Sequence, residues 1–376
     1  MDPCVRLLRE LVAIDSVNPS LVPGAAGEGH IAAAIAAHLR RLGLDVHIQD
    51  VVPGRPNVIG VFEGGQPGRA LMLCGHVDTV GVDGMAAPFD PVERNGRLYG
   101  RGSQDMKGGV AAMIDAVRVL TERPRRRGRV IVAAVIDEEY ASIGADFLVK
   151  EWTADAAVVT EPTDLQIGVG HKGFAWFEIE THGRAAHGSR PKDGRDAIVH
   201  MGRVLGRLEH LDCALRARAP HPVMETASLH ASIIQGGREW SSYPARCQLQ
   251  MERRTIAGET EQSAAAEIQS VLDVLQAADA EFRATSRLVF SRPPYEIPPG
   301  HELISTLGRA AASVGCRAEH VGMSFWTDAA VLGGAGIPSV LFGPGGAGLH
   351  SSEEFVNVNE VLSCRDALVR LAEAWL

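Results

Sequence analysis

The 376-residue sequence lacks the features that mark membrane, secreted and redox proteins. It contains no run of about 18 or more apolar residues, so no transmembrane helix is expected. Residues 1–6 do not form a basic segment followed by an apolar run, which is the pattern of a secretory signal. The 6 cysteines are scattered without the CxxC spacing of a zinc knuckle or a redox pair. These absences predict a cytoplasmic protein with reduced thiols and no membrane partner.

An excess of basic residues is also absent. The formal net charge is -9 and the pI is about 5.9, whereas a nucleic-acid-binding protein needs clustered Lys and Arg to neutralise phosphates. The one basic run, residues 123–127, lies between a helical and a strand pattern and is expected to be a solvated loop. The glycine-rich segment 101–109 lacks the GKS or GKT ending of a phosphate-binding loop, and the chain has no dinucleotide fingerprint. Nucleic acids and nucleotides are therefore not the expected partners.

The length and the ordinary globular composition predict two domains. Over residues 1–170, helical patterns alternate with short apolar runs, which predicts a mixed, largely parallel sheet covered by helices. After residue 173 the expected order becomes strand, helix, strand, strand, helix, strand, the ferredoxin-like arrangement. We therefore expect an α/β catalytic domain, 1–173 and 291–376, that is interrupted by a ferredoxin-like α+β lid and dimerisation domain, 174–290.

Polar side chains follow several of the expected strands. His76 and Asp78 come directly after the apolar run 70–74, at the carboxyl end of a strand, where open α/β folds build their sites. A lone histidine there is more often structural, but Asp78 could hold one imidazole nitrogen while the other binds a metal ion. Asp105 enters an expected helix, 108–120, where it could simply cap free backbone N–H groups.

An acidic triplet closes the next expected strand, 130–136. Asp137, Glu138 and Glu139 are adjacent carboxylates that repel one another unless a cation or a raised pKa relieves them. The alternative interpretation is a solvated acidic turn with no ligand.

Two further candidates complete the pattern. Glu161 ends the expected strand 156–159, and His350 follows the strand 338–342 and a glycine-rich turn. Two histidines and at least three carboxylates thus fall at the ends of successive strands of one sheet. This combination predicts a two-metal site for Zn²⁺ or a similar ion, because an aspartate can bridge two such ions.

The sequence resembles the dinuclear-metal amidohydrolases and peptidases, a family that includes acetylornithine deacetylase, succinyl-diaminopimelate desuccinylase, glutamate carboxypeptidase and aminoacylase. The resemblance covers essentially the whole chain and depends on the segments GHVDTV, RGSQDMKGG, DEE and TEP and on the late histidine. It implies two divalent ions, zinc first, with cobalt and manganese as alternatives. His76, Asp105 and Glu161 would bind one ion. Asp105, Glu139 and His350 would bind the other, so that Asp105 bridges them.

The resemblance also implies catalytic roles. Glu138 matches the general base of the family, which takes a proton from the attacking water and returns it to the leaving amine. Asp78 matches the carboxylate behind the metal-binding histidine. In the inserted domain, His187 resembles the histidine that reaches into the partner subunit's site and stabilises the tetrahedral oxyanion. This role implies a homodimer formed through residues 174–290.

Three positions are candidates for substrate contact. Arg254 falls where relatives carry an arginine that can pair with a substrate carboxylate. Ser241 stands where many relatives have a substrate-contacting asparagine, which is a departure from the family pattern. Thr327 belongs to a segment, 325–327, whose side chains shape the pocket or lie in the core.

The expected activity is metal-dependent hydrolysis of the amide bond of an N-acyl, and first of all an N-acetyl, amino acid. The segments 171–173 and 253–255 resemble the acetylornithine deacetylase branch. A dipeptidase or carboxypeptidase is the alternative, because the same site cleaves any amide whose product side bears a carboxylate. Carbamoyl-amide hydrolysis is disfavoured, because carbamoyl-amide hydrolases resemble relatives that carry a histidine at the position of Glu161. A metal-binding homologue without catalysis is a third hypothesis, which the presence of Glu138 and all expected ligands disfavours.

Overall fold

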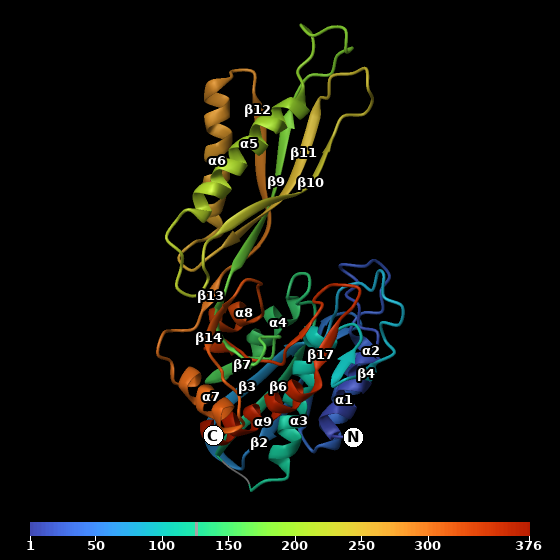
Figure 1. The fold of residues 1–376 in the computed structure, drawn as a ribbon, viewed down its shortest axis with the longest axis vertical. Helices are drawn as coiled ribbons and strands as arrows, with labels where there is room; N and C mark the ends of the chain where they lie inside the picture. The colour runs from blue at the N-terminus through green and yellow to red at the C-terminus, as the bar shows by residue number, and fades with distance from the viewer. Residues whose placement is uncertain (125–126) are drawn as a thin grey trace. The chain divides into compact units, whose positions relative to one another are not determined.

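The computed structural model describes residues 1–124 and 127–376 (Figure 1). Residues 125 and 126, within the basic run, lie outside the described residues, so the loop expected there stays a prediction. The chain forms two compact units. The first unit comprises Met1–Val169, Ile297–Val321 and Thr327–Leu376, and the second comprises Gly170–Glu296 with Gly322–Trp326.

The first unit is built on one mixed sheet. Its strands are β1 (Asp45–Val52), β2 (Arg55–Glu63), β3 (Gln66–His76), β6 (Arg127–Val135), β7 (Ala156–Val159), β8 (Ile167–His171) and β15 (Ser339–Leu341), in the spatial order β1-β2-β6-β3-β7-β15-β8. The pairs β6-β3, β3-β7 and β7-β15 are parallel, whereas the pairs nearer the two edges are antiparallel. The α/β class is confirmed, and the parallel pairing is confined to the centre of the sheet.

Helices surround this sheet. They are α1 (Pro3–Val12), α2 (Gly29–Arg41), α3 (Gly108–Thr121), α4 (Ile143–Glu151), α7 (Glu302–Ser313), α8 (Ala329–Gly334) and α9 (Val358–Trp375). Helix α3 packs against α1 and α9, while α2 and α4 each pack against β1 and β2. Because α3 is enclosed by helices and strands, nearly all of its residues are buried.

The central strands have to be apolar on both faces of the sheet, because helices surround the sheet and successive side chains of a strand point to opposite faces. Five consecutive residues of β3, Ala70–Cys74, are at most 6% exposed. This part of β3 therefore holds no polar side chain, and polar residues follow where the strand ends. His76 is the last residue of β3, and its backbone pairs with Val135 of β6.

A small antiparallel sheet lies in the same unit and was not expected from the sequence. Its strands are β4 (Val92–Arg94), β5 (Arg97–Tyr99), β16 (Gly346–Ala347) and β17 (Phe355–Asn357), in the order β16-β17-β5-β4. Strands of two or three residues leave no periodic pattern in a sequence. The pairing of β17 with β5 brings the segment after His350 next to the segment before Asp105.

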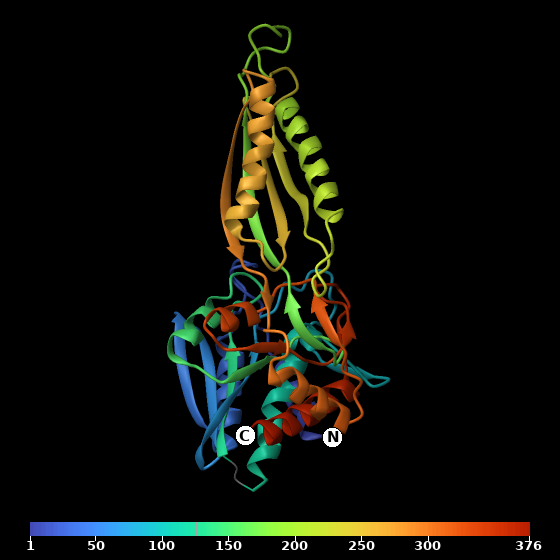
Figure 2. The same cartoon turned by 90° about the vertical axis from the view of Figure 1, so that its left-hand side faces the viewer.

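The second unit has the ferredoxin-like arrangement that the sequence predicts. Its main elements are β9 (Gly173–His182), α5 (Ala197–Arg216), β10 (Ser228–Gly236), β11 (Arg246–Thr255), α6 (Glu261–Ala278) and β12 (Arg283–Arg292). The strand order is β10-β11-β9-β12, with antiparallel neighbours throughout. Helices α5 and α6 lie side by side on one face of this sheet (Figure 2). The apolar core, including Phe177 and Ile179, lies between these two layers.

Short elements complete the description. β13 (Tyr295–Glu296) pairs with β8, and β14 (His320–Met323) also pairs with β8. None of the helices found in residues 1–124 and 127–376 has both the length and the apolar character that a membrane span requires.

Candidate metal centre

The imidazole of His76 lies at the end of β3 and is almost completely buried, at 1% exposure. Its Nδ1 lies 3.1 Å from the backbone oxygen of Asp78 and 3.5 Å from the Asp78 carboxylate. This contact orients the ring so that Nε2 faces a group of acidic side chains. Nε2 lies 3.2 Å from Oδ1 of Asp105. One nitrogen of His76 is thus held by the protein, and the other is available to a ligand.

Asp105 lies between the two histidines of the site. While Oδ1 faces His76, Oδ2 lies 3.3 Å from Nε2 of His350. Asp105 does not cap helix α3, because it lies within the preceding π-helical turn, Ser103–Lys107, where its backbone angles are non-helical. The N-cap of α3 is Lys107. The capping interpretation of Asp105 was therefore wrong, and its carboxylate presents one oxygen to each histidine.

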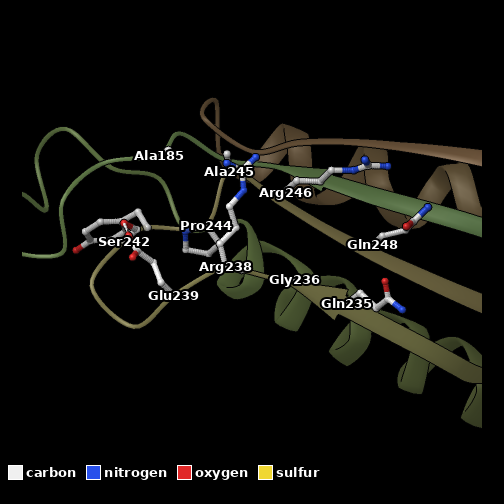
Figure 3. Close-up of a pocket in the computed structure, with 12 residues that line it drawn as sticks. Ala185, Gln235, Gly236, Arg238, Glu239, Ser242, Pro244, Ala245, Arg246 and Gln248 are labelled. Carbon is white, nitrogen blue, oxygen red and sulfur yellow. Dashed lines mark hydrogen bonds between the residues drawn. The ribbon is translucent and has the colours of Figure 1, made fainter.

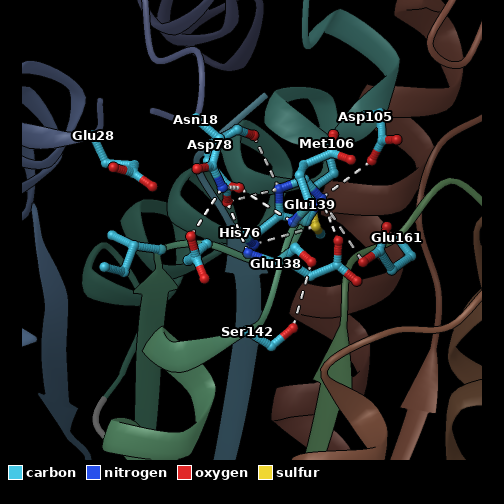
Figure 4. A network of polar contacts seen from close by, with 12 residues as sticks. Asn18, Glu28, His76, Asp78, Asp105, Met106, Glu138, Glu139, Ser142 and Glu161 are labelled. Carbon is cyan, nitrogen blue, oxygen red and sulfur yellow. Dashed lines mark hydrogen bonds and ion pairs between the residues drawn. The ribbon is translucent and has the colours of Figure 1, made fainter. Parts of the chain in front are cut away.

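The glutamates expected at the strand ends also reach this cluster (Figure 4). Oε2 of Glu138 lies 3.9 Å from Nε2 of His76, and Oε1 of Glu161 lies 4.0 Å from the same nitrogen. Oε2 of Glu139 lies 3.0 Å from Nε2 of His350. The side chains of these glutamates are between 4% and 11% exposed, so the acidic segment after β6 is not a solvated turn.

Burial places these carboxylates under electrostatic strain. It raises the pKa of Glu138 and Glu161 well above the usual range and that of Glu139 to about 7. Hydrogen bonds to Asp105 and Glu139 raise the pKa of the His350 imidazole to about 10. The donors form two overlapping groups whose ligand atoms lie within 4.8 Å of one another: His76, Asp105 and Glu139, and His76, Glu138 and Glu161. A divalent cation would relieve the repulsion among these acids, and imidazole with carboxylate suits zinc and its neighbours.

Asp137 points away from this cluster although it is adjacent to Glu138. Its backbone has a φ of 68°, a left-handed conformation that Asp tolerates better than most residues. Oδ1 accepts hydrogen bonds from Nη2 of Arg55 at 2.8 Å and from Nδ2 of Asn18 at 3.1 Å. Only the two glutamates of the acidic triplet therefore contribute charge to the cluster.

Asn18 links this ion pair to the residue behind His76. The same Nδ2 donates to Oδ2 of Asp78 at 2.8 Å. The buried Asp78 carboxylate also accepts the backbone N–H groups of Glu138 and Glu139, at 3.1 and 3.2 Å. Asp78 thus orients His76 and at the same time fixes the segment that carries both glutamates. Burial opposes the charge on Asp78, but the donors of His76 and Asn18 lower its pKa.

This geometry can be set beside known proteins. The family model for Peptidase family M20/M25/M40 matches residues 72–374, which include every residue of the cluster. The chain belongs to this family. Its members are metal-dependent hydrolases, so the enzyme class that we expected and the resemblance read from the motifs are both confirmed.

Relatives of this M20/M25/M40 member differ in substrate. The chain is 29% identical to an N-formyl-4-amino-5-aminomethyl-2-methylpyrimidine deformylase of Bacillus subtilis, covering 99% of this chain and 94% of the relative. It is 28% identical to an acetylornithine deacetylase of Photorhabdus laumondii, covering 99% and 97%. Among solved structures it is similar to a tripeptidase from Staphylococcus aureus, with a TM-score of 0.84, 20% identity and coverage of 99% and 97%. The last similarity bears on the fold alone.

His187 and Ser241 lie together in the second unit of this family member. The Gly188 backbone N–H donates to the Ser241 carbonyl at 2.7 Å, and His187 forms an isolated bridge with Ser242. Both His187 and Ser241 are exposed, and Nδ1 of His187 lies 2.8 Å from the Ser189 hydroxyl. The two loops border a cavity of about 600 Å³ lined by Ala185, Gln235, Gly236, Gly237, Arg238, Glu239, Ser242, Tyr243, Pro244, Ala245, Arg246 and Gln248 (Figure 3).

The other two substrate-contact candidates have local partners. Nε of Arg254 donates to Oε1 of Glu252 at 2.7 Å, and its guanidinium lies over the ring of Phe174, 5.6 Å from the centroid. Arg254 belongs to the second unit, whereas Thr327 belongs to the first. Thr327 is fully buried, and its hydroxyl accepts the backbone N–H of Ala329 at 3.2 Å near the start of α8.

Asn18 and Arg55 were missed by sequence reasoning. Asn18 lies in a loop and Arg55 is the first residue of β2, both far from the motifs in sequence, and neither lies in a pattern that suggests chemistry. Glu354 lies four residues after His350, and no pattern in the sequence assigned it a role. The pairing of distant segments would have been needed to find all three.

Proposed function

We propose that this M20/M25/M40 member is a two-metal amidohydrolase that removes a short acyl group from the nitrogen of an amino acid. The observation that carries the proposal is the position of Asp105, whose two oxygens face two different histidines at 3.2 and 3.3 Å. A carboxylate with this disposition is suited to bridge two ions, since each oxygen has its own neighbouring imidazole.

The remaining ligands divide between the histidines. His76 with Glu161 would complete the binding of one ion, and His350 with Glu139 that of the other. The distances support this division for Glu139, which lies 3.0 Å from His350. Glu138 and Glu161 lie about equally far from Nε2 of His76, at 3.9 and 4.0 Å, so these distances do not separate their roles. We assign proton transfer to Glu138 because it matches the general base of the family. Zinc fits this donor set, and cobalt and manganese are the alternatives to be compared with it.

The residues of the chain then perform the reaction in a definite order. When bound, the two ions would supply an activated water and polarise the amide carbonyl. Glu138 accepts the proton of the attacking water and returns it to the leaving nitrogen. Burial raises the pKa of Glu138, which strengthens this carboxylate as the acceptor of the water proton. Asp78 holds His76 and the Glu138 backbone in place throughout, through contacts at 3.1 Å to each.

The nature of the substrate is supported by the relatives. The deformylase and the deacetylase are both named for the removal of a small acyl group. Arg254 offers a planar guanidinium for a substrate carboxylate, and it would have to exchange its contact with Glu252 for that purpose. A peptidase activity is the second candidate, because the same site would cleave any amide whose product side bears a carboxylate.

A homodimer formed through the second unit is part of the proposal. Strand β10 is an edge strand, and its residues Ile233 and Ile234 are 52% and 51% exposed. On the neighbouring α5, Ile198 and Val199 are also exposed. An exposed apolar edge of this kind favours pairing with a second copy. Light scattering should give a dimer for the native chain and a monomer for Ile234→Lys; a native monomer would refute this part.

The function is tested with metal-depleted enzyme reloaded with Zn²⁺, Co²⁺ or Mn²⁺. Hydrolysis of N-formyl and N-acetyl amino acids is compared with that of dipeptides and tripeptides, by kcat/KM. We expect activity to vanish on chelation, to return with metal, and to be highest on the short acyl substrates. Faster turnover of peptides would favour the second candidate. Activity that persists without metal would refute the two-metal mechanism.

A further inference from the structure

A buried carboxylate outside the ligand cluster holds the turn that carries Asp105. The side chain of Glu354 is fully buried. Its Oε1 accepts the backbone N–H groups of Gln104 at 2.9 Å and Asp105 at 3.1 Å. Its Oε2 accepts the backbone N–H of Gly102 at 2.9 Å and Nη1 of Arg101 at 2.7 Å. Both carboxylate oxygens are therefore occupied by donors from a single turn.

The small sheet explains why Glu354 meets this turn. Phe355 of β17 lies opposite Tyr99 of β5, and the Gly100 N–H then donates to the Glu354 carbonyl at 3.1 Å. The chain turns at Gly102, which has a φ of 77°. A Cβ on Gly102 would lie 2.6 Å from Cγ2 of Thr79, so no larger residue fits. The N–H groups that follow are thereby directed at the Glu354 carboxylate.

Arg101 balances the buried charge and ties in two more segments. It is 3% exposed. Besides Glu354, its guanidinium donates to the carbonyl of Ser351 at 2.9 Å and to that of Gly81 at 3.0 Å. Ser351 is adjacent to His350, and Gly81 follows the loop of Asp78. The pair of Glu354 and Arg101 therefore connects the segments of both histidines with the turn of Asp105.

We propose that Glu354 is a positioning residue of the metal centre. It holds the backbone at Asp105 so that one carboxylate oxygen faces His76 and the other faces His350. This inference rests on the proposed function, in which Asp105 bridges two ions. Groups that orient metal ligands from behind contribute about 10- to 100-fold to metal affinity or activity. An aspartate shared by two ions is especially sensitive, because a rotation of its backbone displaces both oxygens.

The neighbouring Glu353 is a matched control. It has the same side chain, lies next to Glu354 in sequence, and is exposed. Glu353→Gln changes the charge of the segment as Glu354→Gln does but leaves the turn of Asp105 untouched. In Glu354→Gln the amide keeps one acceptor oxygen and directs an NH₂ group at N–H donors. Glu354→Asp retains the buried charge but withdraws the oxygens by one methylene, so it serves if the glutamine variant does not fold.

The experiment measures Zn²⁺ affinity by competition with a chromophoric chelator, the visible spectrum of the Co²⁺ form, the melting temperature of the metal-free protein, and kcat with saturating metal. For Glu354→Gln we expect Zn²⁺ affinity to fall by about 10- to 100-fold, with an altered Co²⁺ spectrum and a lower kcat. Glu354→Asp should lose affinity to a smaller extent. Glu353→Gln should match the native protein in all four measurements.

Two results would overturn the inference while leaving the proposed function in place. The first is native Zn²⁺ affinity and a native Co²⁺ spectrum in both Glu354 variants. The second is a defect confined to the melting temperature of the metal-free protein, which would make Glu354 merely structural. Asp105→Asn tests the proposed function separately. If Asp105 is not a metal ligand, this variant will bind Zn²⁺ as tightly as the native chain does.

Discussion

Removal of the Arg55 guanidinium should destabilise the first unit strongly. Nε and Nη2 of Arg55 each donate to one oxygen of Glu28 at 2.6 Å, and Nη2 also donates to Asp137 at 2.8 Å. The side chain of Arg55 is 12% exposed, and those of its two acidic partners are 0% and 1% exposed. Arg55→Met keeps much of the apolar stem but leaves two buried carboxylates without their cation.

The size of the effect follows from this burial. Breaking a buried ion pair by removing one partner costs about 3–5 kcal/mol, since the other charge stays buried and uncompensated. For a unit of this size, each kcal/mol lowers the melting temperature by about 2–4 °C. We therefore expect Arg55→Met to melt roughly 6–20 °C below the native protein. Arg55→Lys keeps the charge but loses the two-pronged contact with Glu28, and it should fall between the two.

The assay is thermal unfolding of the metal-free protein, followed by circular dichroism at pH 7. Arg287→Met is the control, because Arg287 is 64% exposed and pairs with Glu178 at the surface. Such exposed pairs contribute about 0–1 kcal/mol. Burial raises the pKa of Glu28, so the deficit of Arg55→Met should shrink as the pH falls toward 4.5, the ordinary pKa of Glu, because protons then neutralise the unpaired Glu28 carboxylate. A variant that melts within about 2 °C of the native protein would refute this account of the buried network.

Three further predictions concern catalysis and pH. Glu138→Gln should lower kcat by about 10²- to 10⁴-fold in steady-state assays, because the proton acceptor is lost; undiminished turnover would contradict its role as base. Arg254→Met should raise KM for N-acyl amino acids but not for N-acyl amines that lack a carboxylate, and equal changes for both would argue against the contact. Burial lowers the pKa of His171 from 6.5 to about 4, so stability that is complete above pH 6.5 should decline by roughly 3 kcal/mol as the pH falls through 4. Urea titrations at several pH values should show that His171→Phe removes this slope, and an unchanged slope would exclude His171 as its source.

Much of the first unit could be predicted because its central strands are buried on both faces. A continuous apolar run such as Ala70–Cys74 has one reasonable location in an α/β protein, and the polar residues that follow it must lie at the edge of the sheet. The ferredoxin-like order of the second unit was equally readable from alternating patterns. Strand β1, helix α4 and the small sheet were missed. Most residues of β1 and α4 are not buried, so they give a weak apolar pattern, and the strands of the small sheet have only two or three residues.

The acidic triplet shows where sequence reasoning ended. Three neighbouring carboxylates look alike in the sequence, yet Asp137 turns to Arg55 while Glu138 and Glu139 turn to the histidines. The direction of each side chain depends on the φ of 68° at Asp137, which only the folded loop imposes.

The sequence by itself determined the family, the reaction class and the set of side chains that meet at the sheet edge, because these depend on strand ends and on the order of motifs. The tertiary structure decided which of these side chains are held and by what. Asp105 divides its oxygens between His76 and His350, and Glu354 holds the turn beneath it, through contacts between residues far apart in the chain. Such contacts depend on the pairing of β5 with β17, and no local pattern of residues encodes that pairing.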